Sequence, residues 1–154
     1  MNALVLYESE FGNTQQIARA ITSVLARHGA ARLESIYRLG HSVLEGVDLL
    51  ILGSPTQYQE ATPDMLAWLD RIPPRALYGM PVGVFDTRYH LPRLLAGSAA
   101  ESISKTIQQQ GGNLIAPPKS FFVTEREGPL EAGEIERAAS WAGMLVAKAA
   151  AARA

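Results

Sequence analysis

Short apolar runs alternate with amphipathic segments of helical length along the whole chain, and this alternation restricts the possible folds more than any other feature. Residues 3–7 and 47–52 are apolar at almost every position, as in strands buried on both faces. Between them, residues 14–28 repeat apolar side chains at the spacing of one helix face, and Gly29 follows. Alternating strands and helices predict an α/β fold in which helices cover both faces of a parallel sheet.

The rest of the chain continues this pattern without a repeat or a linker, so we expect one domain over residues 1–154. Further strands are expected at residues 32–37 (at a sheet edge), 81–86, and in a region containing 114–115 and 121–123. Further helices are expected at residues 62–72, 98–110 and 131–152.

Composition excludes several classes of protein. The chain has no cysteine, which rules out disulfides, iron–sulfur clusters and thiolate nucleophiles. Its formal net charge of -1 argues against nucleic-acid binding. No apolar run approaches the ~20 residues of a membrane span, and the N-terminus does not resemble a signal peptide, so a cytoplasmic location is expected. The three histidines lack metal-site spacing, and no metal is expected.

The first loop (residues 8–14, ESEFGNT) connects the first strand to the first helix. Backbone N–H groups at a helix N-terminus lack helical partners and favour an anion. Gly12 can adopt positive φ, and the hydroxyls of Ser9 and Thr14 can act as further donors. The loop contains no Lys or Arg, which argues against a Walker A nucleoside triphosphatase. It indicates a phosphate-binding loop, with a plain helix cap as the alternative.

Two segments resemble those of a known family. Residues 9–14 resemble the FMN phosphate loop of flavodoxins, which usually reads Thr/Ser-x-Thr-Gly-x-Thr. The second loop (residues 53–61) begins GSPT after the third strand, precedes a short helix ending in WLD, and resembles the family's second flavin loop. The resemblance covers the whole order of elements. It implies a flavodoxin-like doubly wound sandwich with a five-stranded parallel sheet in the order 2-1-3-4-5.

The resemblance also implies noncovalent FMN as the cofactor. Phe11 stands where the family usually has a threonine, so one hydroxyl for the phosphate is missing and backbone N–H groups have to compensate. The implied phosphate-binding residues are Ser9, Glu10, Phe11, Gly12, Asn13 and Thr14. The second loop is expected beside the isoalloxazine ring, where Tyr58 can stack on the ring or remain an exposed loop residue. Its implied cofactor-binding residues are Pro55, Thr56, Gln57 and Tyr58.

The third loop (residues 86–93) follows the fourth strand, and the resemblance places it over the pyrimidine side of the flavin. Tyr89 or His90 would provide aromatic cover. Arg88 near the ring would favour an anionic reduced flavin, unless it forms a structural pair with Asp86. The implied cofactor-binding residues here are Asp86, Thr87, Arg88 and Tyr89.

The second loop also departs from electron-carrier flavodoxins, because it has no glycine between Ser54 and Ala61. In those proteins a glycine lets a peptide beside the flavin turn over on reduction, into a turn that needs positive φ. A residue with a Cβ reaches that conformation at a cost of roughly 1–2 kcal/mol. We therefore expect weaker stabilisation of the one-electron-reduced flavin, which favours paired-electron chemistry.

Three functions fit to different degrees. The first is an FMN-dependent electron-transfer protein that serves a redox partner protein or a small electron donor or acceptor, with no catalytic residue of its own. The second is a small FMN-dependent NAD(P)H:quinone-type oxidoreductase, which the cationic third loop slightly favours. The third is a receiver-type binding module, which lacks support because Gly53-Ser54 ends the third strand where a receiver needs aspartate. The oligomeric state does not follow from the sequence.

Overall fold

The computed structural model of the chain describes residues 1–38, 40–91, 95 and 97–153. Its central parallel sheet has the strand order β2-β1-β3-β5-β6. Both β6 and β7 pair in parallel with β5 and together fill the fifth position, so the predicted order 2-1-3-4-5 is confirmed. The strands are β1 (Asn2–Tyr7), β2 (Ala30–Ser35), β3 (Leu49–Gln57), β4 (Glu60–Ala61), β5 (Pro81–Tyr89), β6 (Asn113–Leu114) and β7 (Lys119–Val123).

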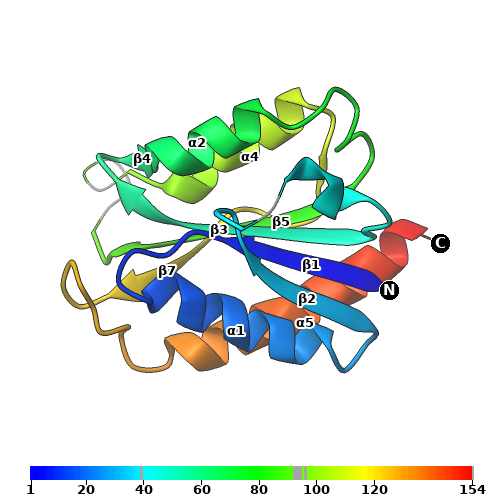
Figure 1. Cartoon of the computed structure of the whole chain (residues 1–154). Helices are drawn as coiled ribbons and strands as arrows, with labels where there is room; N and C mark the ends of the chain where they lie inside the picture. The colour runs from blue at the N-terminus through cyan, green and yellow to red at the C-terminus, as the bar shows by residue number, and fades with distance from the viewer. Residues whose placement is uncertain (39, 92–94, 96, 154) are drawn as a thin grey trace.

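Helices cover both faces of this sheet, as Figure 1 shows. On one face lie α1 (Asn13–Leu25) and α5 (Glu134–Arg153), and on the other lie α2 (Pro63–Asp70) and α4 (Ala99–Gln109). A short 3-10 helix, η1 (His41–Leu44), precedes β3. Among the residues described, no helix is long and apolar enough to cross a membrane.

Alternate residues of the central strands serve the two helical layers. In β1, Ala3 and Val5 belong to the hydrophobic cluster under α1 and α5, whereas Leu4 and Leu6 belong to the cluster under α2 and α4. Successive side chains in a strand point to opposite faces of its sheet. A central strand must therefore be apolar at nearly every position, which is why β1 reads as an uninterrupted apolar run.

The structure corrects several predicted boundaries. Helix α1 ends at Leu25, three residues before the predicted end at His28. The strands predicted to end at Leu52 and Asp86 continue to Gln57 and Tyr89, into segments predicted as loops. These extensions have pairing partners: β3 pairs with β4 over Thr56–Gln57, and β5 pairs with β7 from Phe85 to Tyr89. The predicted loop residues are therefore held by backbone ladders.

Three smaller boundary shifts have local causes. Strand β2 starts two residues before its predicted start, because the Ala30 N–H donates to the Met1 carbonyl. Helix α2 starts at Pro63 rather than at residue 62, because Thr62 caps it by accepting from the Met65 N–H at 3.2 Å. Helix α5 starts at Glu134 rather than at residue 131.

The late start of α5 protects an open sheet edge. The Phe122 N–H of β7 donates to the Glu134 carboxylate at 2.8 Å, and the Phe122 carbonyl accepts from the Glu131 N–H at 2.8 Å. Both backbone groups of Phe122 are thereby hydrogen-bonded at the edge of the sheet, where unpaired backbone groups could pair with a strand of another chain.

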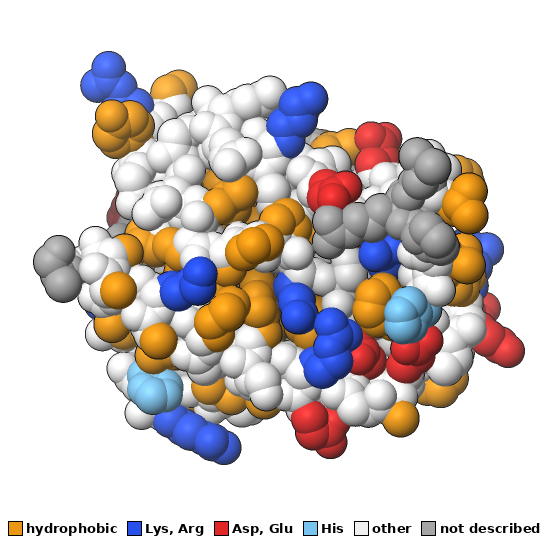
Figure 2. Space-filling view, turned by 180° about the vertical axis from the view of Figure 1, so that it is seen from behind, with side chains coloured by type: hydrophobic (Ala, Val, Ile, Leu, Met, Phe, Trp, Pro, Cys, Tyr) orange, Lys and Arg blue, Asp and Glu red, His pale blue; other side chains and the backbone are white. Residues whose placement is uncertain are grey.

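Seen from behind, the molecule shows hydrophobic side chains across its middle, interspersed with Lys and Arg side chains (Figure 2).

An aromatic cluster joins α5 to the sheet. Phe85 of β5, Phe121 of β7 and Trp141 of α5 are all buried. Their ring centroids lie 5.9–6.2 Å apart in edge-to-face arrangements, a favoured geometry for aromatic pairs. Phe85 and Phe121 lie in β5 and β7 where these strands pair, next to the third loop. The cluster therefore fixes the strands under the polar end of the sheet.

We expect Trp141→Ala to lower the free energy of unfolding by about 3–5 kcal/mol, because it leaves a cavity among packed rings. Met144→Ala on the same helix should change it by no more than about 0.5 kcal/mol, since Met144 is 39% exposed. Urea unfolding followed by far-UV circular dichroism measures both. Equal effects of the two substitutions would show that the cluster does not anchor α5.

Candidate functional site

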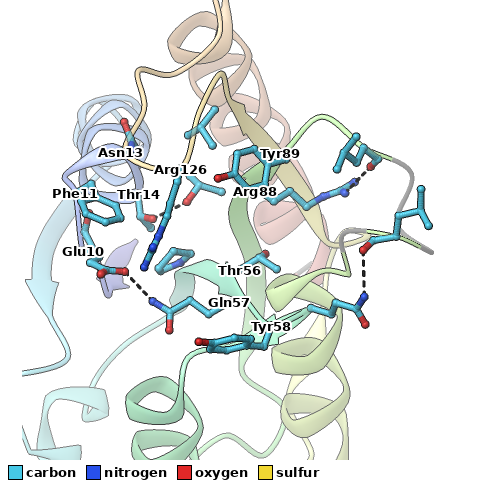
Figure 3. A pocket seen from close by; sticks show the side chains of 17 residues that line it. Glu10, Phe11, Asn13, Thr14, Thr56, Gln57, Tyr58, Arg88, Tyr89 and Arg126 are labelled. Carbon is cyan, nitrogen blue, oxygen red and sulfur yellow. Dashed lines mark hydrogen bonds between the residues drawn. The ribbon is translucent and has the colours of Figure 1, made fainter.

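A cavity of about 540 Å³ opens at the carboxyl ends of the parallel strands, where β1, β3, β5 and β7 meet the segments that follow them. Figure 3 shows its walls, with Phe11 and Thr14 on one side, Gln57 and Tyr58 below, and Arg88 and Tyr89 opposite. All the predicted site residues except Gly12 and Asp86 line it. Those residues are Ser9, Glu10, Phe11, Asn13, Thr14, Pro55, Thr56, Gln57, Tyr58, Thr87, Arg88 and Tyr89. Pro92 and Arg93 of the third loop lie outside the described residues.

The first loop holds several backbone donors ready at the start of α1. Gly12 is the N-cap residue with φ 92°, in the left-handed region that glycine reaches freely, and it has no side chain with which to cap the helix. Ser9 Oγ accepts from the N–H groups of Gly12 at 3.1 Å and Gln15 at 3.3 Å. In the described part of the chain, the N–H groups of residues 10, 11, 13 and 14 donate to no protein acceptor. Together with the helix dipole, they suit an anion.

Two buried threonines meet below this loop. Thr14 Oγ1 and Thr87 Oγ1 lie 2.8 Å apart, and the two residues are 1% and 5% exposed. In such a pair one hydroxyl donates to the other, so the second hydroxyl proton remains available for a further acceptor. The pair therefore offers one donor from the floor of the cavity.

The second loop is a tight hairpin rather than an irregular loop. Tyr58 and Gln59 have φ values of 48° and 70°, as expected for the two central residues of a type I′ turn between β3 and β4. Gln57 Nε2 donates to Glu10 Oε2 at 2.8 Å and ties this hairpin to the first loop. In place of the missing glycine, the folded chain holds two residues with a Cβ at positive φ.

Asp86 lies behind the cavity wall and connects its parts. Its side chain is fully buried, and Oδ2 accepts from Ser98 Oγ at 2.6 Å, the Ala100 N–H at 3.0 Å and Thr56 Oγ1 at 3.3 Å. Burial raises the pKa of the Asp86 carboxyl above its usual range, while Ser98, the Ala100 N–H, Ser120 and the Arg88 guanidinium act in the opposite direction. Asp86 thus organises the start of α4 and does not line the cavity.

The Arg88 guanidinium makes most of its polar contacts with other residues of the protein. Its Nε donates to Ser120 Oγ at 2.9 Å and lies 4.0 Å from Asp86 Oδ1, and its NH1 donates to the Leu91 carbonyl at 2.9 Å. The guanidinium also lies 5.3 Å from the centre of the Phe122 ring. Of the two alternatives for Arg88, these contacts favour the structural pair with Asp86.

Of the two aromatic residues expected to cover the flavin from the third loop, only Tyr89 lines the cavity. Tyr89 lines the cavity and is 41% exposed. His90 does not line it and stacks on Phe122, with ring centroids 4.0 Å apart, and its Nδ1 lies 3.2 Å from Glu131 Oε2.

Sequence reasoning missed part of the cavity wall. Arg126, in the segment after β7, lines the cavity and points into it between the first loop and the second (Figure 3). Its sequence context, between Glu125 and Glu127, predicts a solvated loop, and the structure corrects this for Arg126. Since the carboxyl ends of all parallel strands share one edge, the same rule applied to the fifth strand would have included this arginine. The other lining residues that were not predicted are Gln59, Leu91, Leu95 and Val123.

A second, smaller cavity of about 290 Å³ shares Ser9, Glu10 and Gln57 with the first. It is acidic: the Tyr37 hydroxyl lies 2.9 Å from Glu8 Oε1 and 2.8 Å from Asp64 Oδ2. Partial burial and the two carboxylates raise the pKa of that hydroxyl. These carboxylates would repel a phosphate, so an anionic ligand is directed to the larger cavity.

Comparison with known proteins identifies the family. A sequence model of the flavodoxins matches residues 5–144. This chain belongs to the flavodoxin family. No curated protein matches the sequence.

Solved structures agree with the flavodoxin fold. Flavodoxin 2 from Bacillus cereus is 22% identical with a TM-score of 0.81, over 96% of this chain and 99% of that one. A flavodoxin from the domain Archaea is 18% identical with a TM-score of 0.77, over 97% and 99%. Rubredoxin oxygen:oxidoreductase from Desulfovibrio gigas is 18% identical with a TM-score of 0.79, over 99% of this chain but 37% of that one.

Flavodoxins bind FMN and use it to transfer electrons to redox partners, so this chain is an FMN-binding electron-transfer protein. The cavity fits that cofactor. Its volume lies within the ~300–1,000 Å³ of small-molecule sites. Within the described part of the chain, the unpaired N–H groups of the first loop suit a phosphate, and apolar lining from Tyr58 and Tyr89 suits a flat ring.

We expect Asp86→Asn to stabilise the protein relative to the parent as the pH rises. Because the pKa of Asp86 is raised in the folded state, its contribution to stability is full below the ordinary carboxyl value of about 3.9 and is lost as the pH rises through the folded value. Asparagine cannot ionise and escapes this loss. Urea unfolding of both proteins between pH 3.5 and 8 measures the difference, and a difference that stays constant or falls with pH would contradict the raised pKa.

Proposed function

We propose that FMN occupies the 540 Å³ cavity with its phosphate at the first loop and its ring between the second loop and the third. One observation carries this orientation: the unpaired N–H groups of residues 10, 11, 13 and 14 gather at the start of α1, next to the Thr14–Thr87 hydroxyl pair. A phosphate there would meet backbone donors, a hydroxyl and the helix dipole together. When bound, FMN supplies the redox chemistry, and the chain supplies binding and orientation.

Exposed apolar side chains around the cavity mouth support electron exchange with a partner at this surface. Tyr58 is 97% exposed, Leu95 65%, Leu91 49% and Tyr89 41%. All four line the cavity, so their exposed parts surround the position proposed for the ring. Apolar and aromatic side chains of this kind are typical of surfaces that contact other molecules. We infer a redox partner protein or a small electron donor or acceptor, in the cytoplasm.

An electron carrier fits this site better than a NAD(P)H-dependent reductase. The reductase hypothesis depended on Arg88 as a free cation and on the missing glycine. Arg88 is 8% exposed and donates to Ser120 and to the Leu91 carbonyl, so little of its guanidinium remains for a substrate. The weaker stabilisation of the one-electron-reduced flavin expected from the missing glycine stays a prediction, and Tyr58 and Gln59 occupy this turn with positive φ. A carrier would not consume NAD(P)H steadily with a quinone, whereas a reductase would.

The hydroxyl pair provides the sharpest test of the proposed orientation. Thr14→Val and Thr87→Val should each weaken FMN binding by roughly tenfold to a hundredfold, because each removes part of a donor to a charged phosphate. The double variant should weaken it little further, since the two hydroxyls offer one donor together. FMN titration followed by quenching of flavin fluorescence measures these affinities.

Thr22→Val is the matched control, because Thr22 lies about two turns along the same helix and its hydroxyl donates to the Ala18 carbonyl at 2.8 Å. It should bind FMN as the parent does. Riboflavin, which has no phosphate, should bind the parent weakly and be insensitive to all three single substitutions. If Thr14→Val and Thr87→Val bind FMN as tightly as the parent, the phosphate lies elsewhere.

A further inference from the structure

Phe11 and Arg126 form a pair across the mouth of the cavity. The Arg126 guanidinium lies 5.9 Å from the centre of the Phe11 ring, within the range of a cation–π contact. The two residues come from different segments, the first loop and the segment after β7, and both line the cavity. Figure 3 shows the arginine reaching down beside Phe11 and Thr14.

Phe11 is also the position at which the first loop lacks a hydroxyl that the flavodoxin pattern usually supplies. The loop has no cation of its own, and the nearest carboxylate in sequence, Glu10, is engaged with Gln57 Nε2 at 2.8 Å. A guanidinium stacked on the Phe11 ring therefore lies beside the place where a donor is missing.

The Arg126 guanidinium keeps its donors available. Within the described part of the chain, the guanidinium makes a cation–π contact with Phe11 and forms no ion pair or hydrogen bond. Arg88, in contrast, is buried and bonded on two sides. A guanidinium carries five N–H donors in a planar fork that matches the oxygens of a phosphate.

The segment that carries Arg126 is docked onto the first loop. Asn13 Nδ2 donates to the Glu127 carbonyl at 3.1 Å. Gly128 has φ 104°, and a Cβ there would lie 2.6 Å from Asn13 Oδ1, so only glycine allows this approach. Thr124 N–H donates to the Pro129 carbonyl at 2.9 Å and closes the turn. Arg126 is thus held against the start of α1 before any ligand binds.

We propose that Arg126 is a phosphate-binding residue of this flavodoxin, which replaces the missing hydroxyl at position 11 with a guanidinium supported on the Phe11 ring. This assignment rests on the proposed orientation of FMN, with its phosphate at the first loop. It gives the site a cation from a segment outside the first loop. It also makes cofactor selection depend on charge: FMN is favoured over riboflavin, and the preference weakens as salt screens the guanidinium.

The test compares the affinities of FMN and riboflavin for the full chain at about 20 mM and about 500 mM salt. Arg126→Gln should weaken FMN binding at low salt by roughly tenfold to a hundredfold and leave riboflavin binding within about twofold. High salt should shrink the effect on FMN. Arg126→Lys should retain part of the FMN affinity, because the charge remains but the planar fork is lost. Arg27→Gln, at the opposite end of α1, changes the net charge equally and should leave both affinities unchanged.

A second variant tests the pairing itself. Phe11→Thr in the Arg126→Gln background restores the usual hydroxyl and should recover at least part of the lost FMN affinity. If Arg126→Gln weakens FMN and riboflavin equally, Arg126 contacts the ring, and the proposal is wrong. Unchanged FMN affinity in Arg126→Gln would overturn it as well. If Thr14→Val weakens FMN binding and Arg126→Gln does not, the role of Arg126 is wrong but the proposed orientation of FMN stands. If the parent binds FMN and riboflavin equally well, both the role of Arg126 and the proposed orientation are wrong.

Discussion

The cavity wall depends on the hydrogen bonds that the buried Asp86 carboxylate accepts. Its Oδ2 joins β5 to Thr56 of β3 and to the start of α4 through Ser98 and the Ala100 N–H. Arg88, 4.0 Å away, extends the network to Ser120 of β7. A fully buried carboxylate is expensive unless it is hydrogen-bonded and paired. Those partners bring three strand ends and one helix N-terminus together, at the edge where a doubly wound sheet binds its ligands.

The fold followed from the sequence because its dominant signal is simple. A strand buried on both faces must be apolar throughout, and a helix on its surface must repeat apolar residues along one side. The strand at residues 3–7 and the helix predicted at 14–28 could therefore be assigned without any tertiary information, although the helix ends at Leu25. The order of strands followed from the resemblance to flavodoxins. The first loop was also readable, since Gly12 and Thr14 lie at the junction of a strand and a helix, where the chemistry of a helix N-terminus applies.

The remaining parts of the site depend on pairing between one segment and another, which the pattern within either segment does not reveal. The polar residues Thr56 and Asp86 gave no sign that their strands continue, because the pairing partners, Ala61 and Ser120, come from elsewhere in the chain. The positive φ of Tyr58 follows from the tight hairpin and not from its own preference. Arg126 reads locally as a solvated charge, and only the docking of its segment on Asn13 brings it to the cavity.

Hydrogen–deuterium exchange of the chain with and without FMN tests the location of the cofactor most directly. Four separate segments form the proposed site, and slower exchange on binding reports which amides become protected. The account predicts added protection confined to residues 9–14, 56–59, 87–91 and 124–127. Protection centred instead on residues 37 and 62–64, around the smaller acidic cavity, or spread evenly over the helices, would contradict it.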